Sequence, residues 1–445
     1  MGYTEEYLDL CARKLGAMIR IPTVSRAEDE DLTEFYRLHA LLEELFPLIH
    51  QKLTRTVLRG SLLFHWATGS ELEPILLMGH QDVVPASEEG WSVGAFSGTV
   101  KDGRLYGRGA LDCKGTVFTE LQAIEELLEE GYAPTRDIYL AYSINEETGG
   151  DGAAGVMRHL KERGIRLALA LDEGGAVIDK AVEGMDRPYA TVGVTEKGYM
   201  DVKITARGKG GHSSTPPRHT PAARLFAFAE EIERKRPFRK KLLPVAQEML
   251  RAMAPSFPKP LGFFMKHTTL FRPLLTAVMP RVSPFGEAVL QTTCCFTMMQ
   301  GSSAANVIPK EPYLVANLRT SVHQNCDESL AVLQRYADKH DLELTVLLRR
   351  DASPVSDLRS GAYAHVTGLI REHFPEAGTA PYMLMGGTDC RHFHALTDSA
   401  LRFSPIRMTA AQSASCHAVD ENVTVSALAE AVGFYKDLIR RFPTN

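Results

Sequence analysis

The sequence predicts an α/β protein in which helices cover a mostly parallel sheet, with a second, smaller α+β domain inserted into the chain. Short apolar runs alternate with segments whose apolar residues recur at helical spacing, a pattern typical of α/β layering. With 445 residues, 44% of them hydrophobic, the chain is long enough for two domains. Near the middle this alternation changes to a strand, a helix and two further strands, which predicts the inserted domain.

The expected elements follow from these patterns. Buried strands are expected at 137–144, 166–172 and 380–386, and in the apolar run that starts at residue 74. Helical spacing predicts helices at 4–20, 31–49, 115–130, 152–163, 358–373 and 424–441. The middle of the chain predicts a strand over 199–209, a helix near 219–234, a long segment rich in Pro and Phe, and two strands that end near 322. We therefore expect a catalytic domain formed by 1–193 and 319–445, and an inserted domain over 194–318.

Charge, hydropathy and cysteine usage exclude several classes of function. The net charge is −5 and the basic residues form no stripe, so no nucleic-acid partner is expected; the basic run 233–241 is interpreted as a solvated helix end. The sequence has no apolar run long enough to span a membrane and no leader pattern, so we expect a cytoplasmic protein without a membrane partner. Seven cysteines without C-x-x-C spacing argue against a disulfide framework and against a thiolate zinc site.

Polar side chains collect where the predicted strands end. The run "PILLMGHQD" ends in His80 and Asp82, which are two residues apart and therefore lie on one face of a strand. Ligands of open α/β sheets bind beyond the carboxyl ends of the strands, so such residues should converge on one place. The other candidates at strand ends or in adjacent Gly-rich turns are Asp112, Glu146, Glu147, Asp172, Glu173 and His417.

Histidines and carboxylates brought together in this way need a cation between them. A mixed His and carboxylate set without thiolate suits zinc first, and also cobalt or manganese. Two metals with one bridging carboxylate would need five ligands, which His80, Asp112, Glu147, His417 and one acid of the Asp172–Glu173 pair can supply. Since neighbouring side chains diverge, one of Glu146 and Glu147 binds metal and the other is free to act as a base. The pair His392 and His394 is expected to open a helix and is not counted as a metal site.

A set of ordered motifs makes the prediction more specific. They are "GHQDVVP", "GRGALDCKG", "NEETGG", "LDEGG", "GKGGHSSTPP", "NVIP", "GGTDCRHF" and "CHAVDEN". Together they resemble the dizinc metallopeptidases that include carboxypeptidase S, the aminoacylases and succinyl-diaminopimelate desuccinylase. The long insert and the form of "GGTDCRHF" are most similar to the carboxypeptidase S branch. The resemblance covers nearly the whole chain.

The resemblance implies a role for each residue of the metal centre. His80 would bind one zinc, Asp112 would bridge two zinc ions in each subunit, and Glu147 and His417 would bind on the second side. Asp82 would orient the His80 imidazole, and Glu146 would be the general base that takes a proton from the attacking water and passes it to the leaving amine. The resemblance favours Asp172 over Glu173 as the remaining ligand without deciding between them. Asn145 stands where the family usually has Asp.

The resemblance also implies that the inserted domain is a lid that mediates formation of a homodimer. His212 would reach the partner's site and stabilise the oxyanion, and Asn306 would contact the substrate. Arg319 would bind the free carboxylate of the substrate, in a pocket lined by Gly386, Gly387 and Thr388.

The function predicted from these observations is hydrolysis of the amide bond that releases a C-terminal amino acid from a small peptide or an N-acyl amino acid. A dedicated deacylase of one metabolic intermediate is an alternative within enzymes. A binding protein that kept the fold and lost the chemistry is the alternative from another class, although retention of Glu146 with every candidate ligand speaks against it.

Overall fold

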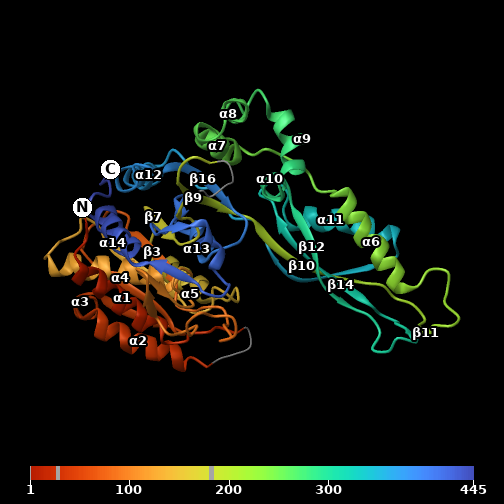
Figure 1. Cartoon of the computed structure of the whole chain (residues 1–445), viewed down its shortest axis with the longest axis horizontal. Helices are drawn as coiled ribbons and strands as arrows, with labels where there is room; N and C mark the ends of the chain where they lie inside the picture. Colours follow the sequence, from red (N-terminus) through yellow and green to blue (C-terminus); the bar gives the residue numbers. More distant parts are fainter. Residues whose placement is uncertain (1, 27–30, 180–184, 445) are drawn as a thin grey trace.

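The computed structural model describes residues 2–26, 31–179 and 185–444, and confirms the predicted fold class. A large mixed sheet forms the core of one lobe and a separate antiparallel sheet forms a second lobe, which extends to the right in Figure 1. The two chain ends lie near each other on the first lobe.

The large sheet has ten strands in the order β1-β2-β6-β3-β7-β17-β9-β8-β18, with β16 paired to β9. The pairings of β3 with β6 and β7, of β17 with β7, of β16 with β9 and of β18 with β8 are parallel. The strands are β1 Thr54–Leu58, β2 Ser61–Trp66, β3 Ile75–His80, β6 Ile138–Ser143, β7 Leu169–Asp172, β8 Val177–Asp179, β9 Tyr189–Glu196, β16 Gly378–Leu384, β17 Ala400–Arg402 and β18 Arg407–Thr409.

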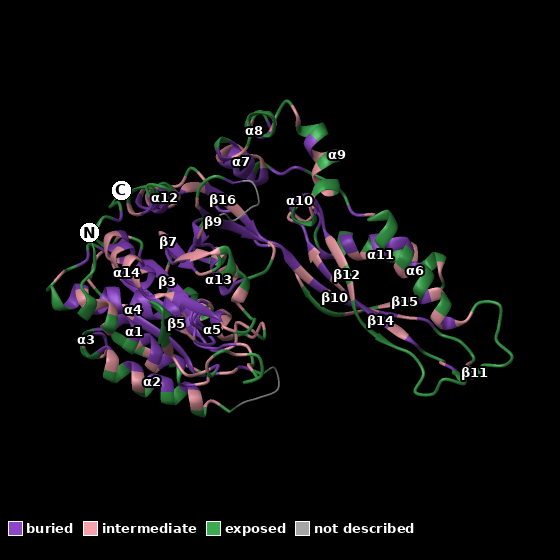
Figure 2. Cartoon of the chain, viewed as in Figure 1, coloured by how far each residue is buried: buried purple, intermediate pink, exposed green. Residues whose placement is uncertain are grey.

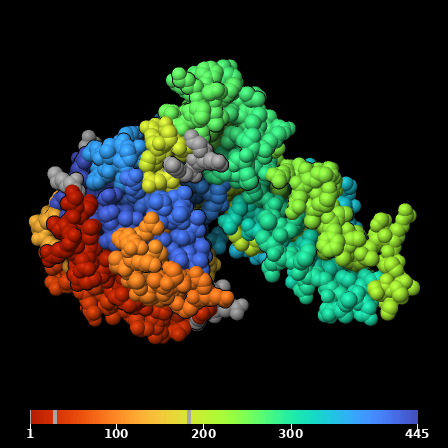
Figure 3. All heavy atoms as spheres, in the orientation of Figure 1, coloured from red at the N-terminus to blue at the C-terminus, as the bar shows by residue number. Residues whose placement is uncertain are grey.

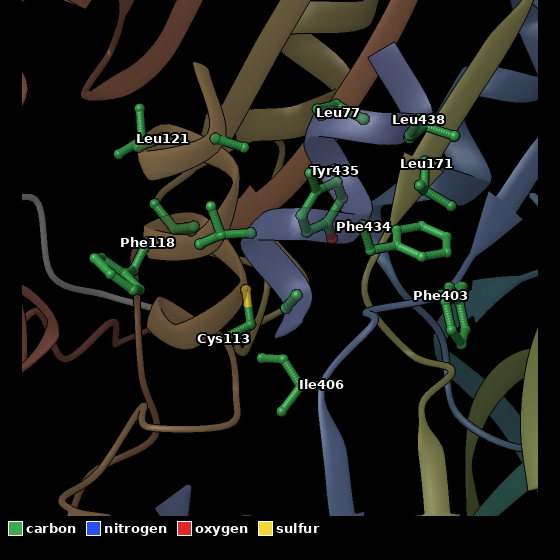
Figure 4. Packing of buried hydrophobic residues seen from close by; sticks show 14 of the residues in the cluster. Leu77, Cys113, Phe118, Leu121, Leu171, Phe403, Ile406, Phe434, Tyr435 and Leu438 are labelled. Atoms are coloured by element: carbon green, nitrogen blue, oxygen red, sulfur yellow. The ribbon is translucent and has the colours of Figure 1, made fainter. Parts of the chain in front are cut away.

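Alternation along β3 shows that helices bury both faces of this sheet. Ile75 and Leu77 point into the main core, whereas Leu76 and Met78 point into a smaller core on the other face. Figure 4 shows the main core, where side chains of α4 and α14 pack beside Leu77 of β3. Because both faces are covered, the strands are almost continuously apolar and their polar residues are found at their ends.

The helices lie close to their predicted positions. The main core is covered by α1 Glu5–Ile19, α2 Thr33–Leu45, α3 Pro47–Lys52, α4 Lys114–Glu129, α12 Gly361–His373 and α14 Val425–Arg440. The other face is covered by α5 Gly152–Glu162 and the 3-10 helix η2 Asp389–Ala395. The hydroxyl of Thr4 accepts a hydrogen bond from the first turn of α1, which fixes where that helix begins.

The second lobe is an antiparallel sheet in the order β12-β14-β10-β15, packed against α6 and α11. Its elements are β10 Gly198–Thr205, α6 Pro221–Lys235, β12 Thr293–Gln300, β14 Tyr313–Thr320, α11 Cys326–Lys339 and β15 Glu343–Arg350. The expected boundary at residue 318 falls inside β14, and β15 pairs with β10. The second lobe therefore ends at about residue 350, whereas the sequence analysis expected it to end at 318, because the strand that completes its sheet follows the expected boundary.

Four short helices occupy the long segment with Pro and Phe, for which the sequence analysis assigned no secondary structure. They are α7 Pro244–Met253, α8 Lys259–Lys266, α9 Arg272–Val282 and α10 Pro284–Leu290. Met249 and Met253 of α7 pack with Ala380 and Met383 of β16, so α7 packs against the large sheet. In Figure 2, α8 and α9 stand out as largely exposed helices above both lobes.

Three smaller features complete the described structure. A sheet of β4 Thr99–Lys101, β5 Arg104–Tyr106 and β19 Asn422–Thr424 brings the C-terminal part of the chain beside the loop that carries Asp112. β11 Gly211–His212 and β13 Val307–Ile308 pair at the far end of the second lobe, and the short helix α13 Ala410–Ser415 precedes His417. Within the described ranges, no helix combines the length and the apolar character needed to cross a membrane.

Candidate metal centre and active site

His80 lies at the carboxyl end of β3, and Asp82 holds its imidazole. His80 Nδ1 lies 2.9 Å from the backbone oxygen of Asp82 and 3.3 Å from its Oδ1. Nδ1 therefore carries the proton that it donates to Asp82, so Nε2 is the nitrogen that would bind a metal. Nε2 lies 3.0 Å from Oδ1 of Asp112, and both His80 and Asp82 are buried.

Asp112 stands between the two histidines. Its Oδ2 lies 3.0 Å from His417 Nε2, and the same nitrogen lies 3.2 Å from Glu147 Oε2. Burial by itself would raise the pKa of Asp112, but the two histidines outweigh burial and lower it. Among the described residues, Asp112 is shared by two groups whose ligand atoms lie close together, one with His80 and Cys113 and one with Glu147 and His417.

The same geometry fits a pair of divalent metals. Hydrogen bonds to Asp112 and Glu147 raise the pKa of His417 to about 10, so without metal the imidazole is held as a cation by the carboxylates. Oε1 of Glu147 is buried and has no hydrogen-bond partner in the described part of the chain. A bound metal would replace the extra proton of His417, and Oε1 of Glu147 could serve as one of its ligand atoms. Mixed histidine and carboxylate donors suit zinc.

Cys113 lies beside this centre, but its thiol contacts backbone atoms. Its sulfur lies 3.0 Å from the amide nitrogen of His80 and 3.4 Å from the His80 oxygen. Burial raises the pKa of the Cys113 thiol well above its ordinary value. The neutral thiol therefore fastens the end of β3 to the loop of Asp112, as expected for a buried core cysteine.

Asp172 and Glu173 border the centre without joining either group of described ligand atoms. The Asp172 carboxylate accepts the amide N–H groups of Cys390, at 2.8 Å, and of Glu173, at 2.9 Å, and burial raises its pKa to about 7. Burial and then the charge of Asp112 raise the pKa of Glu173 well above its ordinary value. Both acids lie near enough to be influenced by the other groups of the centre, and the choice between them stays a prediction.

The Asp82 carboxylate also fixes the loop that carries Glu146 and Glu147. Its Oδ1 accepts the amide of Glu146 at 3.2 Å and its Oδ2 accepts the amide of Glu147 at 3.1 Å, while Ser25 donates to Oδ2 at 2.6 Å. Glu147 then points to His417, and burial raises the pKa of Glu146 well above its ordinary value. A carboxyl group with a raised pKa is suited to taking up and returning a proton.

Glu421 is an organising residue that the sequence analysis missed. It is fully buried, its Oε1 accepts the amides of Leu111 at 2.8 Å and Asp112 at 3.1 Å, and its Oε2 lies 2.6 Å from Nη1 of Arg108. This carboxylate therefore ties the Asp112 loop to the segment that follows His417. The motif "CHAVDEN" contains the signal, an acid four residues after a candidate ligand.

Arg319 reaches a basic cavity of about 340 Å³ that adjoins the metal centre. Its guanidinium stacks on the ring of Tyr199, 4.7 Å from the ring centre. Lys197 lines the same cavity but donates its ammonium hydrogens to the backbone oxygens of Ala288 and Gln291. The other basic side chains on the wall are Arg350 and Arg391, and the metal-site side chains there are Glu146, Glu147 and His417. Two further acids, Glu196 and Asp351, also line the cavity.

The predicted substrate loop is placed in part as expected. Gly386 and Gly387 line the basic cavity. Thr388 is buried and faces inward, because its amide and hydroxyl donate to Glu196 at 2.9 and 3.0 Å. Arg402 pairs with Glu196 at 2.6 Å. Thr388 thus anchors the loop through Glu196, and its hydroxyl is not directed at the cavity.

His212 and Asn306 lie far from this centre within one chain. His212 belongs to β11 at the distal tip of the second lobe in Figure 1, where its Nδ1 contacts the hydroxyl of Ser214 at 2.8 Å. The backbone oxygen of Asn306 accepts the amide of Ser213 at 3.0 Å, and both His212 and Asn306 are exposed. A single chain therefore does not bring these two residues to the metal centre.

A second, apolar cavity of about 680 Å³ also borders the metal centre. Asp112 and Glu173 form its polar end. Its apolar wall includes Leu111, Ile178, Met253, Phe285, Tyr382, Ile406 and Met408. Cavities of this size hold small organic molecules, and the wall favours an apolar one.

The family follows from a match over most of the chain. A family model described as peptidase family M20/M25/M40 matches residues 76–441. The chain belongs to this family. It is a metallo-hydrolase that acts on peptide or amide bonds, which confirms the resemblance seen in the sequence motifs.

Members of the M20 family with related sequences cover almost the whole chain. It is 35% identical to "N-fatty-acyl-amino acid synthase/hydrolase PM20D1" of Xenopus tropicalis, over 97% of this chain and 85% of the frog protein. It is 33% identical to the Homo sapiens protein of the same name, over 97% and 87%. It is also 30% identical to "Probable carboxypeptidase S-like 2" of Dictyostelium discoideum, over 96% and 84%.

Solved structures show the same fold at low sequence identity. An M20 family metallo-carboxypeptidase, Sso-CP2 from Sulfolobus solfataricus, matches with a TM-score of 0.73 and 17% identity, over 99% of this chain and 100% of that chain. Human carnosine dipeptidase 1 matches with a TM-score of 0.65 and 14% identity, over 98% of both chains. The expected combination of a mostly parallel sheet with a separate lid sheet is thereby confirmed.

Proposed function

We propose that this M20 metallo-hydrolase cleaves N-acyl amino acids that have long apolar acyl chains, releasing the amino acid and the fatty acid. The observation that carries the proposal is the pair of cavities that border the metal centre, one with an apolar wall and one that holds three arginines and a lysine. A substrate with an apolar acyl group on one side of its amide bond and a free carboxylate on the other would place one group in each cavity. The names of the relatives from Xenopus and Homo sapiens, N-fatty-acyl-amino acid synthase/hydrolases, support the same substrate class.

The basic cavity is suited to the substrate carboxylate. Among the residues that the structure describes, the guanidinium of Arg319 makes one weak hydrogen bond, at 3.4 Å, to the side chain of Asn317, so most of its donors are available to a ligand. Nε and Nη2 of Arg391 are buried and have no hydrogen-bond partner within the described ranges. A bound carboxylate would supply acceptors to these donors, and a guanidinium can hold it through two parallel hydrogen bonds.

In the proposed reaction, two zinc ions would be held by His80, Asp112, Glu147, His417 and one acid of the Asp172–Glu173 pair. When bound, the metals lower the pKa of the attacking water and polarise the amide carbonyl. Glu146 takes the proton from this water and returns it to the nitrogen of the leaving amino acid. Asp82 keeps Nε2 of His80 free and holds the amides of Glu146 and Glu147 in place, and Arg319 positions the substrate through its carboxylate.

We further propose that a homodimer completes the site. His212 and Asn306 are exposed at the tip of the lid, away from the metal centre of their own chain. A second copy related by a two-fold axis could bring each tip to the other's site, where an imidazole would stabilise the oxyanion and Asn306 would contact the substrate.

The proposed substrate class is tested with a panel of zinc-loaded hydrolysis assays. N-dodecanoyl-phenylalanine should be cleaved faster than N-acetyl-phenylalanine, than dipeptides, and than the N-dodecanoyl-phenylalanine amide, which has no free carboxylate. Arg319→Met should lower kcat/KM for the acid about 100-fold, because the carboxylate loses its partner, and should change the amide little. Arg349→Met is the control, since Arg349 lies on β15 one residue from Arg350 but pairs at the surface with Asp327.

The alternatives give different results in the same panel. Preference for dipeptides would favour a carboxypeptidase, and release of a single amino acid would favour a dedicated deacylase. Zinc binding without hydrolysis of any compound would favour a binding protein without catalytic activity.

A further inference from the structure

The helical segment above the two lobes exposes apolar side chains to solvent. α8 and α9 project at the top of the molecule in Figure 1, and the same segment forms a protrusion in the space-filling view of Figure 3. Leu270 is 74% exposed and Val282 is 73% exposed. The exposed large apolar residues of this segment are Leu261, Phe263, Leu270, Leu274, Val278, Val282 and Phe285.

Four of these residues form a continuous stripe. Leu274, Val278 and Val282 of α9 follow one another at intervals of four residues, so each neighbours the next on the helix surface, and Leu270 lies in the turn two residues before α9 begins. The adjacent face of α9 already has a partner, because Leu275 is buried in the core cluster beside β16. The stripe is therefore extra apolar surface that the chain's own core does not use, and contiguous apolar surface of this kind marks an interaction site.

The charge of the same segment has one sign. Residues 249–286 contain no Asp or Glu and five Lys or Arg, although the whole chain has a net charge of −5. Arg251 pairs with Glu248. Within the described parts of the chain, the other four basic side chains have no carboxylate partner; they are Lys259, Lys266, Arg272 and Arg281. An apolar stripe flanked by unpaired basic side chains is typical of helices that lie on anionic membranes.

The apolar surface is continuous with the apolar cavity. Phe285 is 40% exposed, lines the cavity and stacks on Tyr382 with ring centres 6.3 Å apart. Ser283 and Met253, from the two ends of the helical segment, also line the cavity. An acyl chain held at this surface would therefore lie beside the cavity that leads to Asp112.

We propose that the α8–α9 surface docks on an anionic phospholipid bilayer. This surface is defined by the seven exposed apolar residues and the four unpaired basic residues named above. The apolar stripe would enter the interface while the basic side chains contact lipid phosphates and carboxylates. Docking of this kind needs no spanning helix, and it revises the sequence-based expectation that a membrane is not a partner. The consequence for substrate, delivery of acyl chains from the bilayer to the cavity, rests on the proposed function; the docking itself does not.

The test is sedimentation of the full-length protein with phosphatidylcholine vesicles, with and without phosphatidylserine, at low ionic strength. The variant Arg281→Glu/Val282→Ser changes one basic and one apolar residue of the surface. The variant Val100→Ser/Lys101→Glu is a matched control, because it makes the same kind of change at an exposed pair on β4. We expect binding to phosphatidylserine vesicles to weaken about 20-fold or more in the first variant, to remain within about twofold in the control, and to weaken in high salt.

Three results would overturn the proposal. They are no binding of the wild type to phosphatidylserine vesicles, equal loss of binding in both variants, and conversion of a dimer to a monomer by the Arg281→Glu/Val282→Ser change without any binding to lipid. The last result would show that a second copy covers this surface. Hydrolysis of N-dodecanoyl-phenylalanine, measured without vesicles on the same proteins, separates the two proposals: vesicle binding without this hydrolysis would reject the proposed function and leave docking intact.

Discussion

The apolar cavity beside the metal centre predicts how hydrolysis depends on the length of the acyl chain. Each methylene that leaves water for an apolar wall contributes about 0.8 kcal/mol, which is about a fourfold change in rate constant. Lengthening the acyl group from acetyl to hexanoyl adds four methylenes, or about 3 kcal/mol, and the cavity of about 680 Å³ has room for them. We therefore expect kcat/KM to rise by about 200-fold from N-acetyl-phenylalanine to N-hexanoyl-phenylalanine.

Filling the cavity should remove this dependence. Met408 lies on β18 and its half-buried side chain lines the cavity, so Met408→Trp places a larger ring in the path of the acyl chain. The ratio of kcat/KM for hexanoyl over acetyl substrate should fall at least about tenfold, while the acetyl value changes less than about threefold.

Met299→Trp provides the matched control for this prediction. Met299 lies on β12 of the second lobe and is 68% exposed, so the same substitution there should leave the ratio unchanged. A wild-type ratio near one, or equal ratios in wild type and Met408→Trp, would refute the assignment of this cavity to the acyl chain.

Three further predictions concern the lid and the metal centre. Mixing inactive Glu146→Gln protein with His212→Ala protein should restore about a quarter of wild-type activity, because half of the reassorted dimers are mixed and each has one complete site. Zinc binding to metal-free protein near pH 7 should release about one proton from His417, because a pKa of about 10 leaves this imidazole charged whereas a metal ligand must be neutral. Calorimetry in buffers of different ionisation enthalpy measures this proton. For the same reason, the affinity for zinc should rise between pH 7 and 10. Glu421→Gln should lower the free energy of unfolding by about 3 to 5 kcal/mol in denaturant titrations, because it leaves the buried guanidinium of Arg108 without a carboxylate.

Each of these three predictions has a control and a contradicting result. Each inactive variant mixed with itself should stay inactive, and a mixture without activity would contradict the two-fold arrangement. Zinc uptake without proton release would show that His417 is not a ligand. Asp420→Asn is the control for Glu421, because the Asp420 side chain bonds Ser92 near the surface and should cost about 1 kcal/mol or less. Equal losses in the two variants would contradict the role given to Glu421.

The sequence predicted the large sheet well because its strands are buried on both faces. The apolar runs that became β3, β6, β7 and β16 are short and continuous, and each was expected within a few residues of its observed position. The limit of the second lobe was harder to predict. β15 has exposed and half-buried residues along its length, so its pairing with β10 is set by tertiary contacts and leaves little pattern in the sequence.

The four short helices of residues 244–290 were not predicted, and the reason is local. α7, α8, α9 and α10 are short, each has a proline near its start, and α9 contains a further proline, Pro280. Proline is tolerated in the first turn of a helix, but in a sequence alone it predicts the end of a helix.

Most of the candidate metal centre could be predicted because its candidate ligands stand at strand ends or in adjacent loops. His80 and Asp82 share a face as their spacing requires, and the structure brings Asp112, Glu147 and His417 together from loops far apart in sequence. Glu421 and the inward contact of Thr388 with Glu196 could not be predicted, because both depend on which backbone amides a buried carboxylate meets after folding. The structure shows hydrogen-bond networks that spacing alone does not encode.

The central claim is that a metal centre with Glu146 as its base hydrolyses the amide bond of N-acyl amino acids. The most direct test measures hydrolysis of N-dodecanoyl-phenylalanine by metal-depleted protein, with and without added zinc, for wild type and Glu146→Gln. We predict that zinc restores activity in the wild type, and that Glu146→Gln binds zinc equally well but reacts about 1,000-fold more slowly. Zinc binding without hydrolysis by the wild type, or equal rates in the two proteins, would contradict the account.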